Sequence, residues 1–99
     1  MPDKDEARLV GPVLQKGEAG DAVVAAILAQ NPQATVVDRG AYLRVLVPGL
    51  CRVTRAAIER ERGAPFCFPS DLEMIMSSFQ GRLEMSEESA VWCERGRLP

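Results

Sequence analysis

Hydrophobic and polar positions along this chain follow two periods, one helical and one typical of strands. The segment "LVGPVLQ" (residues 9–15) predicts a short strand, which Gly11-Pro12 would place at the edge or the start of a sheet. A glycine-rich loop leads to "DAVVAAILAQNP", whose apolar residues recur at helical spacing. Asp21 is the expected N-cap of this helix, and Pro32 is expected to end it because proline cannot donate a backbone hydrogen bond.

Beyond the first helix the period becomes two. The segments "ATVVD", "AYLRVLV" and "LCRVT" predict three strands, separated by "RG" and by "PG". Gly40 can take the positive φ that a tight hairpin loop needs, and Pro48-Gly49 suits a type II turn. We therefore expect a meander of three consecutive antiparallel strands.

Two helices are predicted next. Thr54 can cap "RAAIERERG", in which Arg55 and Glu59 have the spacing of an intrahelical ion pair, and Gly63 can end it. After an apolar connector, "SDLE" is a capping-box signature, in which Ser70 would cap a further helix closed by Gly81. The stripe expected to face the core in that helix consists of Leu72, Ile75, Met76 and Phe79.

The final segment, "RLEMSEESAVWCE", predicts a hairpin with an acidic turn, with Leu83 and Met85 on one face and Trp92 as a core anchor. The order is therefore strand, helix, three strands, two helices and two strands. This order predicts an α+β fold in a single small domain with a mostly antiparallel sheet. We expect a flexible N-terminus over residues 1–9 and one domain over residues 10–95.

Composition narrows the function classes. The 99 residues contain 46% hydrophobic residues, enough for one core, and the net charge is −2 with both signs interspersed. There is no basic block, and aromatic residues make up 5%, which argues against nucleic acid as the partner. The N-terminus is charged, and no apolar run approaches the ~20 residues of a membrane span. The expected protein is cytoplasmic, has no membrane partner and is a monomer when free.

The sequence contains no histidine, so the usual neutral-pH general base and the commonest nitrogen metal ligand are missing. Cys51, Cys67 and Cys93 are widely spaced and are expected to be buried free thiols. The glycines of "GEAGDA" lack the lysine and the frame of a phosphate-binding loop. We therefore predict no catalytic residue, no metal site and no cofactor.

The strand at residues 41–47 has two different faces. Leu43, Val45 and Val47 share one face, which fits the core. The other face carries Tyr42, Arg44 and Leu46. It is either an ordinary solvated strand face or a docking surface, since Tyr and Arg are residues that interfaces favour.

An ordered series of segments carries a family resemblance: "VGPVL", "NPQATVVDRGAYLRV", "TRAAIERERGAPF", "LEMIMSSFQG" and "AVWCE". From residue 10 to about residue 94 the chain resembles the effector proteins, also called coupling or regulatory proteins, of bacterial soluble di-iron monooxygenases. The toluene and alkene monooxygenase types are the most similar. The resemblance implies a cofactor-free protein, not catalytic alone, that binds the di-iron hydroxylase component. It also implies that binding tunes oxygen activation, substrate access and coupling efficiency.

We expect the hydroxylase-binding residues to be those that match the family pattern and are not needed in the core. They are Asn31, Pro32, Arg39, Tyr42, Arg44, Ser77, Ser78, Gln80 and Gly81. The alternative function is a generic α+β adaptor or small-ligand-binding module. Which hydrocarbon the system oxidises is not encoded in this chain, since the hydroxylase would hold that pocket.

Overall fold

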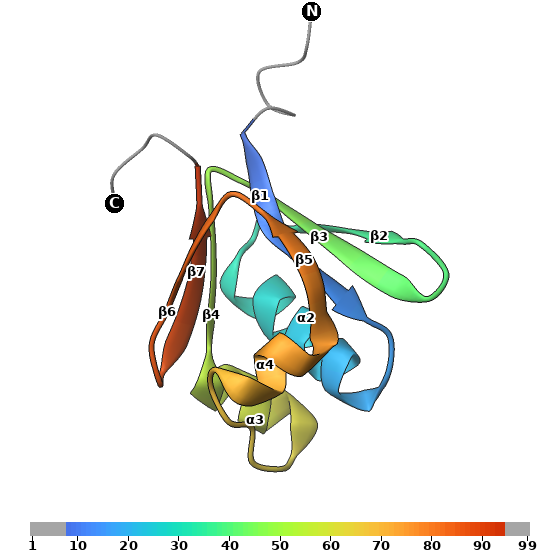
Figure 1. Cartoon of the computed structure of the whole chain (residues 1–99), viewed down its shortest axis with the longest axis vertical. Helices are drawn as coiled ribbons and strands as arrows, with labels where there is room; N and C mark the ends of the chain where they lie inside the picture. The colour runs from blue at the N-terminus through green and yellow to red at the C-terminus, as the bar shows by residue number, and fades with distance from the viewer. Residues whose placement is uncertain (1–7, 95–99) are drawn as a thin grey trace, which may run out of the picture.

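The chain passes from one antiparallel sheet to a second, and both sheets contribute to one hydrophobic core (Figure 1). The computed structural model describes residues 8–94. In this range the first sheet has the order β2 (Thr35–Asp38), β3 (Tyr42–Pro48), β1 (Leu9–Gln15) and β5 (Met76–Gln80). The second sheet has the order β4 (Leu50–Thr54), β7 (Ser89–Cys93) and β6 (Arg82–Met85). The helices are α2 (Glu18–Gln30), α3 (Arg55–Arg62) and α4 (Ser70–Ile75). The predicted α+β class is confirmed.

The core lies between the sheets and the helices. Its largest fully buried side chains come from both sheets, from α2 and α3, and from the segments around α4. They include Trp92, as predicted, with Phe66, Leu14, Ile27, Ile58 and Leu72. In Figure 1, α3 and α4 lie together at one end of the molecule, whereas β1 begins and β7 ends at the other. None of the helices in residues 8–94 has the length and apolar character that crossing a bilayer requires.

The first strand is central and not an edge strand, so that prediction is wrong. β1 pairs antiparallel with β3 on one side and with β5 on the other. Pro12 is tolerated because the β1–β3 register pairs Val10 and Val13 but skips Gly11 and Pro12. Gly11 has φ 144°, and a Cβ there would meet the carbonyl oxygen of Val45, so glycine allows β1 and β3 to approach closely. A flexible terminus is predicted over residues 1–9. Residues 1–7 lie outside the described residues, and Leu9 is already the first residue of β1.

The first helix begins one turn earlier than predicted. α2 starts at Glu18, and the carbonyl oxygen of Gly17 accepts a hydrogen bond from the backbone N–H of Asp21 at 2.8 Å. Asp21 is therefore a residue of the first turn and not the N-cap. Its negative charge still stabilises the helix by interacting with the positive end of the helix dipole. The helix ends before Pro32, as predicted.

The three-stranded meander is only partly present. β2 and β3 form the predicted antiparallel hairpin, but β4 pairs with β7 in the second sheet and not with β3. At the corner between β3 and β4, Gly49 has φ 78°. Its N–H donates to the carbonyl oxygen of Arg8 at 2.8 Å, and its carbonyl oxygen accepts from the N–H of Glu94 at 3.2 Å. Gly49 is thus hydrogen-bonded to the residues that flank β1 and β7, and the chain leaves the first sheet at this corner to pair with β7.

The predicted helix over residues 70–80 is two elements. α4 ends at Ile75, and Met76–Gln80 form β5, which pairs with the free side of β1. The helix predicted from the spacing of the apolar residues is wrong for residues 76–80, because strand pairing with the distant β1 outweighs the local preference. As a result Phe79, expected in the core, is 42% exposed. The capping box is also absent, since Ser70 makes no capping hydrogen bond in α4. Instead, Asp71 accepts from the N–H of Cys67 at 2.9 Å.

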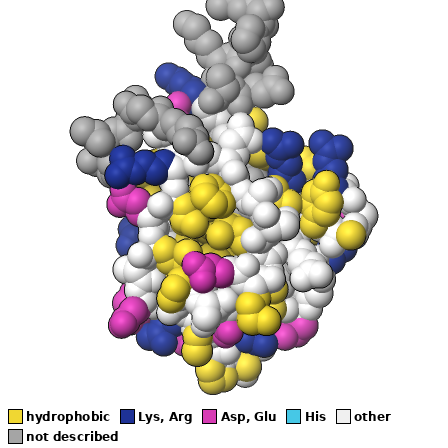
Figure 2. Space-filling view, viewed as in Figure 1, with side chains coloured by type: hydrophobic (Ala, Val, Ile, Leu, Met, Phe, Trp, Pro, Cys, Tyr) yellow, Lys and Arg dark blue, Asp and Glu magenta, His cyan; other side chains and the backbone are white. Residues whose placement is uncertain are grey.

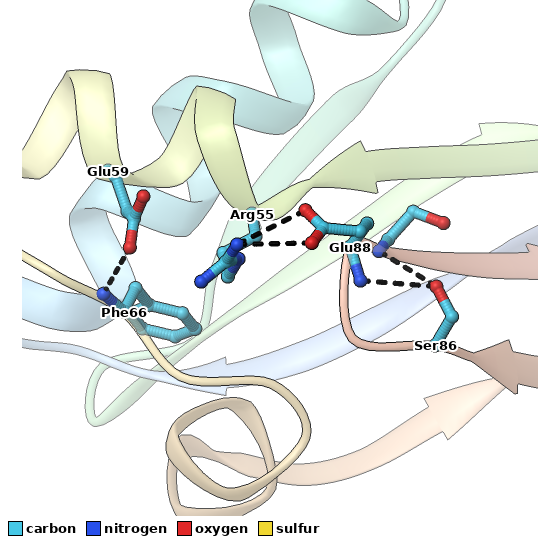
Figure 3. Close-up of polar contacts among 6 residues, drawn as sticks. Arg55, Glu59, Phe66, Ser86 and Glu88 are labelled. Atoms are coloured by element: carbon cyan, nitrogen blue, oxygen red, sulfur yellow. Dashed lines mark hydrogen bonds and ion pairs between the residues drawn. The ribbon is translucent and has the colours of Figure 1, made fainter.

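The final hairpin, β6–β7, forms as predicted, and an ion pair between Arg55 and Glu88 holds its turn to α3 (Figure 3). Thr54 caps α3 by accepting from the N–H of Ala57 at 3.2 Å. The expected Arg55–Glu59 pair is not formed. Arg55 reaches Glu88 in the β6–β7 turn at 3.1 Å, and Glu59 accepts from the backbone N–H of Phe66 at 2.9 Å.

The three cysteines have different environments. Cys51 and Cys93 are buried, as predicted, but Cys67 is exposed. Cys67 lies in the connector before α4, where Phe66 and Phe68 turn into the core and the residue between them faces outward. Burial raises the pKa of the Cys51 thiol to about 12.

Candidate functional site

The outer face of the first sheet carries an open hollow of about 560 Å³, which we call the sheet groove. Its floor is β1, and its sides come from β3, from β5 and from the turn that precedes β3. The lining residues are Gly11, Val13, Arg39, Tyr42, Arg44, Ser77, Ser78, Phe79 and Gln80. On the face drawn in Figure 2, dark-blue basic side chains lie next to yellow hydrophobic ones over this part of the sheet.

Strand alternation places the β3 side chains as the sequence predicts. Val45 and Val47 are buried in the core, whereas Tyr42 is 42% exposed and lines the groove together with Arg44. The register then aligns Arg44 with Val13 on β1, and Val13 with Ser78 on β5. A row of side chains therefore crosses three strands that come from distant parts of the sequence.

A β-bulge shapes the β5 side of the groove. The β1–β5 register shifts between Val13 and Leu14, which pair with Ser78 and Met76 and leave Ser77 as the extra residue. A bulge interrupts strict alternation and re-aims side chains. Ser77 and Ser78, although consecutive, both line the groove.

Arg44 and Gln80 bridge the groove across β1. A guanidinium N–H of Arg44 donates to the side-chain oxygen of Gln80 at 2.7 Å. Gln80 is a neutral partner, so the charge of Arg44 is not compensated by this contact. The bond uses one of the five N–H groups of the guanidinium and holds the plane of the group in place.

A hydrogen-bonded turn positions Arg39. Its backbone N–H donates to the carbonyl oxygen of Tyr42 at 2.9 Å, and Gly40 follows with φ 88°. Asp38 accepts from the N–H of Gly40 at 2.9 Å and pairs with the ammonium of Lys16 at 2.7 Å. The Lys16 ammonium, followed by the Gly40 N–H, lowers the pKa of the Asp38 carboxyl. These contacts tie the turn to the end of β1.

The groove continues into a smaller, more apolar hollow of about 290 Å³. Tyr42 and Ser77 line both hollows. Met74 and Ile75, at the end of α4, line the smaller one, and Met74 is 80% exposed. A partner that fills the groove can therefore also bury an exposed methionine, whose flexible side chain adapts to varied surfaces.

Six of the residues predicted to bind a partner meet in this groove: Arg39, Tyr42, Arg44, Ser77, Ser78 and Gln80. The other three lie elsewhere. Asn31 is 7% exposed, and its amide is hydrogen-bonded to the backbone of Ile27 and Arg52. Pro32 lines a separate shallow hollow with Pro48 and Leu50. Gly81 is buried at the corner between β5 and β6.

Sequence reasoning missed three lining residues. Gly11 and Val13 enter the groove because β1 is its floor, which an edge strand would not provide. The helical spacing of residues 72–79 predicts Phe79 in the core, whereas in β5 its side chain is exposed. A strand interpretation of "MSSFQ", with its two consecutive serines, could have indicated an exposed position.

The groove has the chemistry of a binding surface. It presents two guanidinium groups, a phenol, two hydroxyls and an amide around an apolar floor. In residues 8–94, no group of three or more His, Cys, Asp or Glu side chains is placed to hold a metal ion. The protein is thus a small α+β domain with an open groove on the outer face of its first sheet.

The chain belongs to the MmoB/DmpM family, whose model matches residues 8–93. The alkene monooxygenase system effector subunit of Xanthobacter autotrophicus (strain ATCC BAA-1158 / Py2) is 42% identical over 94 residues. The match covers 93% of this chain and 91% of that relative.

Solved structures share the fold. A chain of the phenol hydroxylase–regulatory protein complex superimposes with a TM-score of 0.78 at 18% identity, over 86% of this chain and 97% of that chain. The soluble methane monooxygenase regulatory protein B gives a TM-score of 0.68 at 22% identity, over 97% of this chain and 71% of that chain.

Proposed function

We propose that this chain is the effector subunit of a multicomponent hydrocarbon monooxygenase of the alkene monooxygenase type. It binds the di-iron hydroxylase component and tunes its oxygen activation, substrate access and coupling efficiency. One observation carries the proposal: the chain is 42% identical to an alkene monooxygenase effector subunit over nearly the full length of both proteins. The catalytic metal and the substrate pocket belong to the hydroxylase.

An effector of this kind acts through differential affinity. A protein that supplies no reacting group changes a partner's chemistry only by binding one of the partner's conformations more tightly than another. A coupling free energy of about 1–3 kcal/mol shifts such populations some 5–150-fold. A rigid docking surface serves this purpose, because ordering it on binding costs little conformational entropy.

We propose the sheet groove as the docking surface for the hydroxylase. Six of the nine residues expected to contact the hydroxylase line it. The Arg44–Gln80 hydrogen bond and the Lys16–Asp38 pair hold its sides in the free protein. Of the remaining three, Asn31 and Gly81 would support the fold, and Pro32 would lie outside the contact.

A titration tests the function. The purified chain is added to its hydroxylase, reductase and electron carrier, and product is measured per NADH consumed. We expect product per NADH to rise to an optimum near an equimolar ratio of chain to hydroxylase. No response at any ratio would overturn the effector role, and a tight small-molecule ligand in the isolated chain would favour a ligand-binding module instead.

A double variant tests the docking surface. Tyr42→Ala with Arg44→Ala should weaken binding to the hydroxylase by at least about tenfold, since Tyr and Arg are typical anchors of interfaces. The thermal unfolding midpoint should stay close to that of the wild type, because both side chains are on the outer face. The control is the single variant Pro32→Ala, which changes a residue outside the groove. It should bind the hydroxylase as tightly as the wild type does. Unchanged affinity of the double variant would remove the groove from the interface.

A further inference from the structure

The charge of the sheet groove is opposite to that of the whole chain. The sequence has 12 basic and 14 acidic residues and a net charge of −2. The lining of the groove nevertheless includes Arg39 and Arg44 and contains no aspartate or glutamate. By contrast, a hollow between α2 and α3 is lined by Glu18, Asp21 and Glu61 with a single arginine.

The two groove arginines also differ from most other basic residues in residues 8–94. Five basic side chains in this range form ion pairs within the chain: Arg8, Lys16, Arg55, Arg62 and Arg82. Four described arginines form no such pair: Arg39, Arg44, Arg52 and Arg60. Two of these four lie in the groove, so no carboxylate among residues 8–94 forms an ion pair with its arginines.

The groove offers hydrogen-bond donors whose arrangement suits a carboxylate. Gln80 holds the guanidinium of Arg44 at 2.7 Å while the remaining N–H groups stay available, and a guanidinium can bind a carboxylate through two parallel hydrogen bonds. The hydroxyls of Ser77 and Ser78 add donors on the β5 side. The rings of Tyr42 and Phe79 supply apolar surface for the methylene groups of an acidic side chain.

We propose that the sheet groove accepts an acidic side chain, Asp or Glu, presented by the docking surface of the hydroxylase. Arg44 binds the carboxylate directly, and Arg39 attracts it from the adjoining turn. This inference rests on the proposed effector function and specifies the chemistry of the partner at the same site. It implies that association is steered by charge and weakens as ionic strength rises.

Binding measurements with charge variants test the proposal. The dissociation constant for the purified hydroxylase is measured by calorimetry at several NaCl concentrations for the wild type, Arg44→Glu, Arg39→Glu and Arg60→Glu. Arg60 is an exposed, unpaired arginine on α3 outside the groove, so its reversal changes the net charge equally. We expect Arg44→Glu and Arg39→Glu to weaken binding at least about tenfold and to flatten its salt dependence, whereas Arg60→Glu stays within about twofold.

A fourth variant keeps the proposal testable if Arg44→Glu does not fold. Gln80→Glu places a carboxylate beside Arg44, so the charge of the guanidinium is compensated by an internal ion pair and attracts an acidic side chain of the partner less strongly. We expect weaker binding to the hydroxylase with a folded protein by circular dichroism. Groove variants that bind and respond to salt as Arg60→Glu does, while the wild type still stimulates the hydroxylase, would overturn this inference and leave the effector function standing. A wild-type chain that does not bind the hydroxylase would overturn both.

Discussion

The side-chain amide of Asn31 forms a two-point hydrogen bond with the backbone of Arg52. The Asn31 oxygen accepts from the Arg52 N–H at 3.0 Å, and the Asn31 nitrogen donates to the Arg52 carbonyl oxygen at 2.7 Å. The same nitrogen donates to the carbonyl oxygen of Ile27 at 2.8 Å. The amide thus joins the C-terminal end of α2 to β4 and satisfies backbone groups of both elements.

Replacing this amide should destabilise the protein. Asn31→Ala removes three hydrogen bonds and leaves partly buried backbone groups without partners, which costs about 2 kcal/mol. For a domain of this size the unfolding midpoint should fall by roughly 10 °C. The measurement is thermal unfolding followed by circular dichroism. The exposed neighbour Gln33 supplies the control, since Gln33→Ala should leave the midpoint within about 2 °C. Equal midpoints for Asn31→Ala and the wild type would contradict the structural role.

Two glycines, Gly49 and Gly81, allow the cost of backbone strain to be measured separately from the cost of a steric clash. Gly49 and Gly81 both have positive φ, at 78° and 101°. A Cβ at Gly49 meets nothing within 4 Å, whereas one at Gly81 would lie 2.6 Å from the carbonyl oxygen of Cys93 and 2.8 Å from Val10. Gly49→Ala should therefore cost about 1 kcal/mol, from strain alone. Gly81→Ala should cost at least about 2 kcal/mol, since the corner between β5 and β6 must also move away from Cys93 on β7 and Val10 on β1. Urea unfolding measures both, and equal losses would show that the close approach at Gly81 is unimportant.

Acid titration should detect the anchoring of the hairpin turn. The pKa of Asp38 is lowered from its ordinary value of 3.8, first by the Lys16 ammonium and then by the Gly40 N–H. A lowered carboxyl pKa contributes stability that is present above the unfolded-state pKa and is lost as pH falls through the folded-state pKa. The loss is therefore confined to the range below about pH 4.

The direct measurement is an NMR titration of the Asp38 carboxyl carbon. In Lys16→Met the pKa should rise toward 3.8, with part of the shift kept because the Gly40 N–H still donates. An Asp38 titration that is unaffected by Lys16→Met would contradict the ion pair.

Thiol labelling should divide the cysteines into two groups. Cys67 is exposed, whereas Cys51 and Cys93 are buried and the Cys51 thiol has a pKa of about 12. A disulfide reagent at pH 8 should therefore modify one thiol rapidly in the native protein and the other two only on unfolding. Cys67→Ser should abolish the rapid phase. Rapid reaction of more than one thiol in the folded protein would contradict the burial of the second sheet's cysteines.

The candidate site was predictable where it depends on one strand. Alternation along β3 separates the buried Val45 and Val47 from Tyr42 and Arg44, because successive side chains in any strand point to opposite faces. Asn31 shows the limit of this reasoning. Nothing in its sequence neighbourhood indicates that its amide pairs with Arg52, 21 residues away. Gly81 likewise allows the corner between β5 and β6 to lie close to β1 and β7, and it contributes no side chain to the groove.

Local sequence is enough to predict the α+β class, the ends of the helices at Pro32 and Gly63, the β2–β3 and β6–β7 hairpins, and the outward face of β3. These features depend on neighbouring residues and on backbone conformations that glycine and proline favour or forbid. Three features depend instead on contacts between distant segments: β1 is central, β4 joins the second sheet, and residues 76–80 form a strand with a bulge at Ser77. Strand pairing depends on partners distant in the sequence, and those partners decide which side chains meet in the groove.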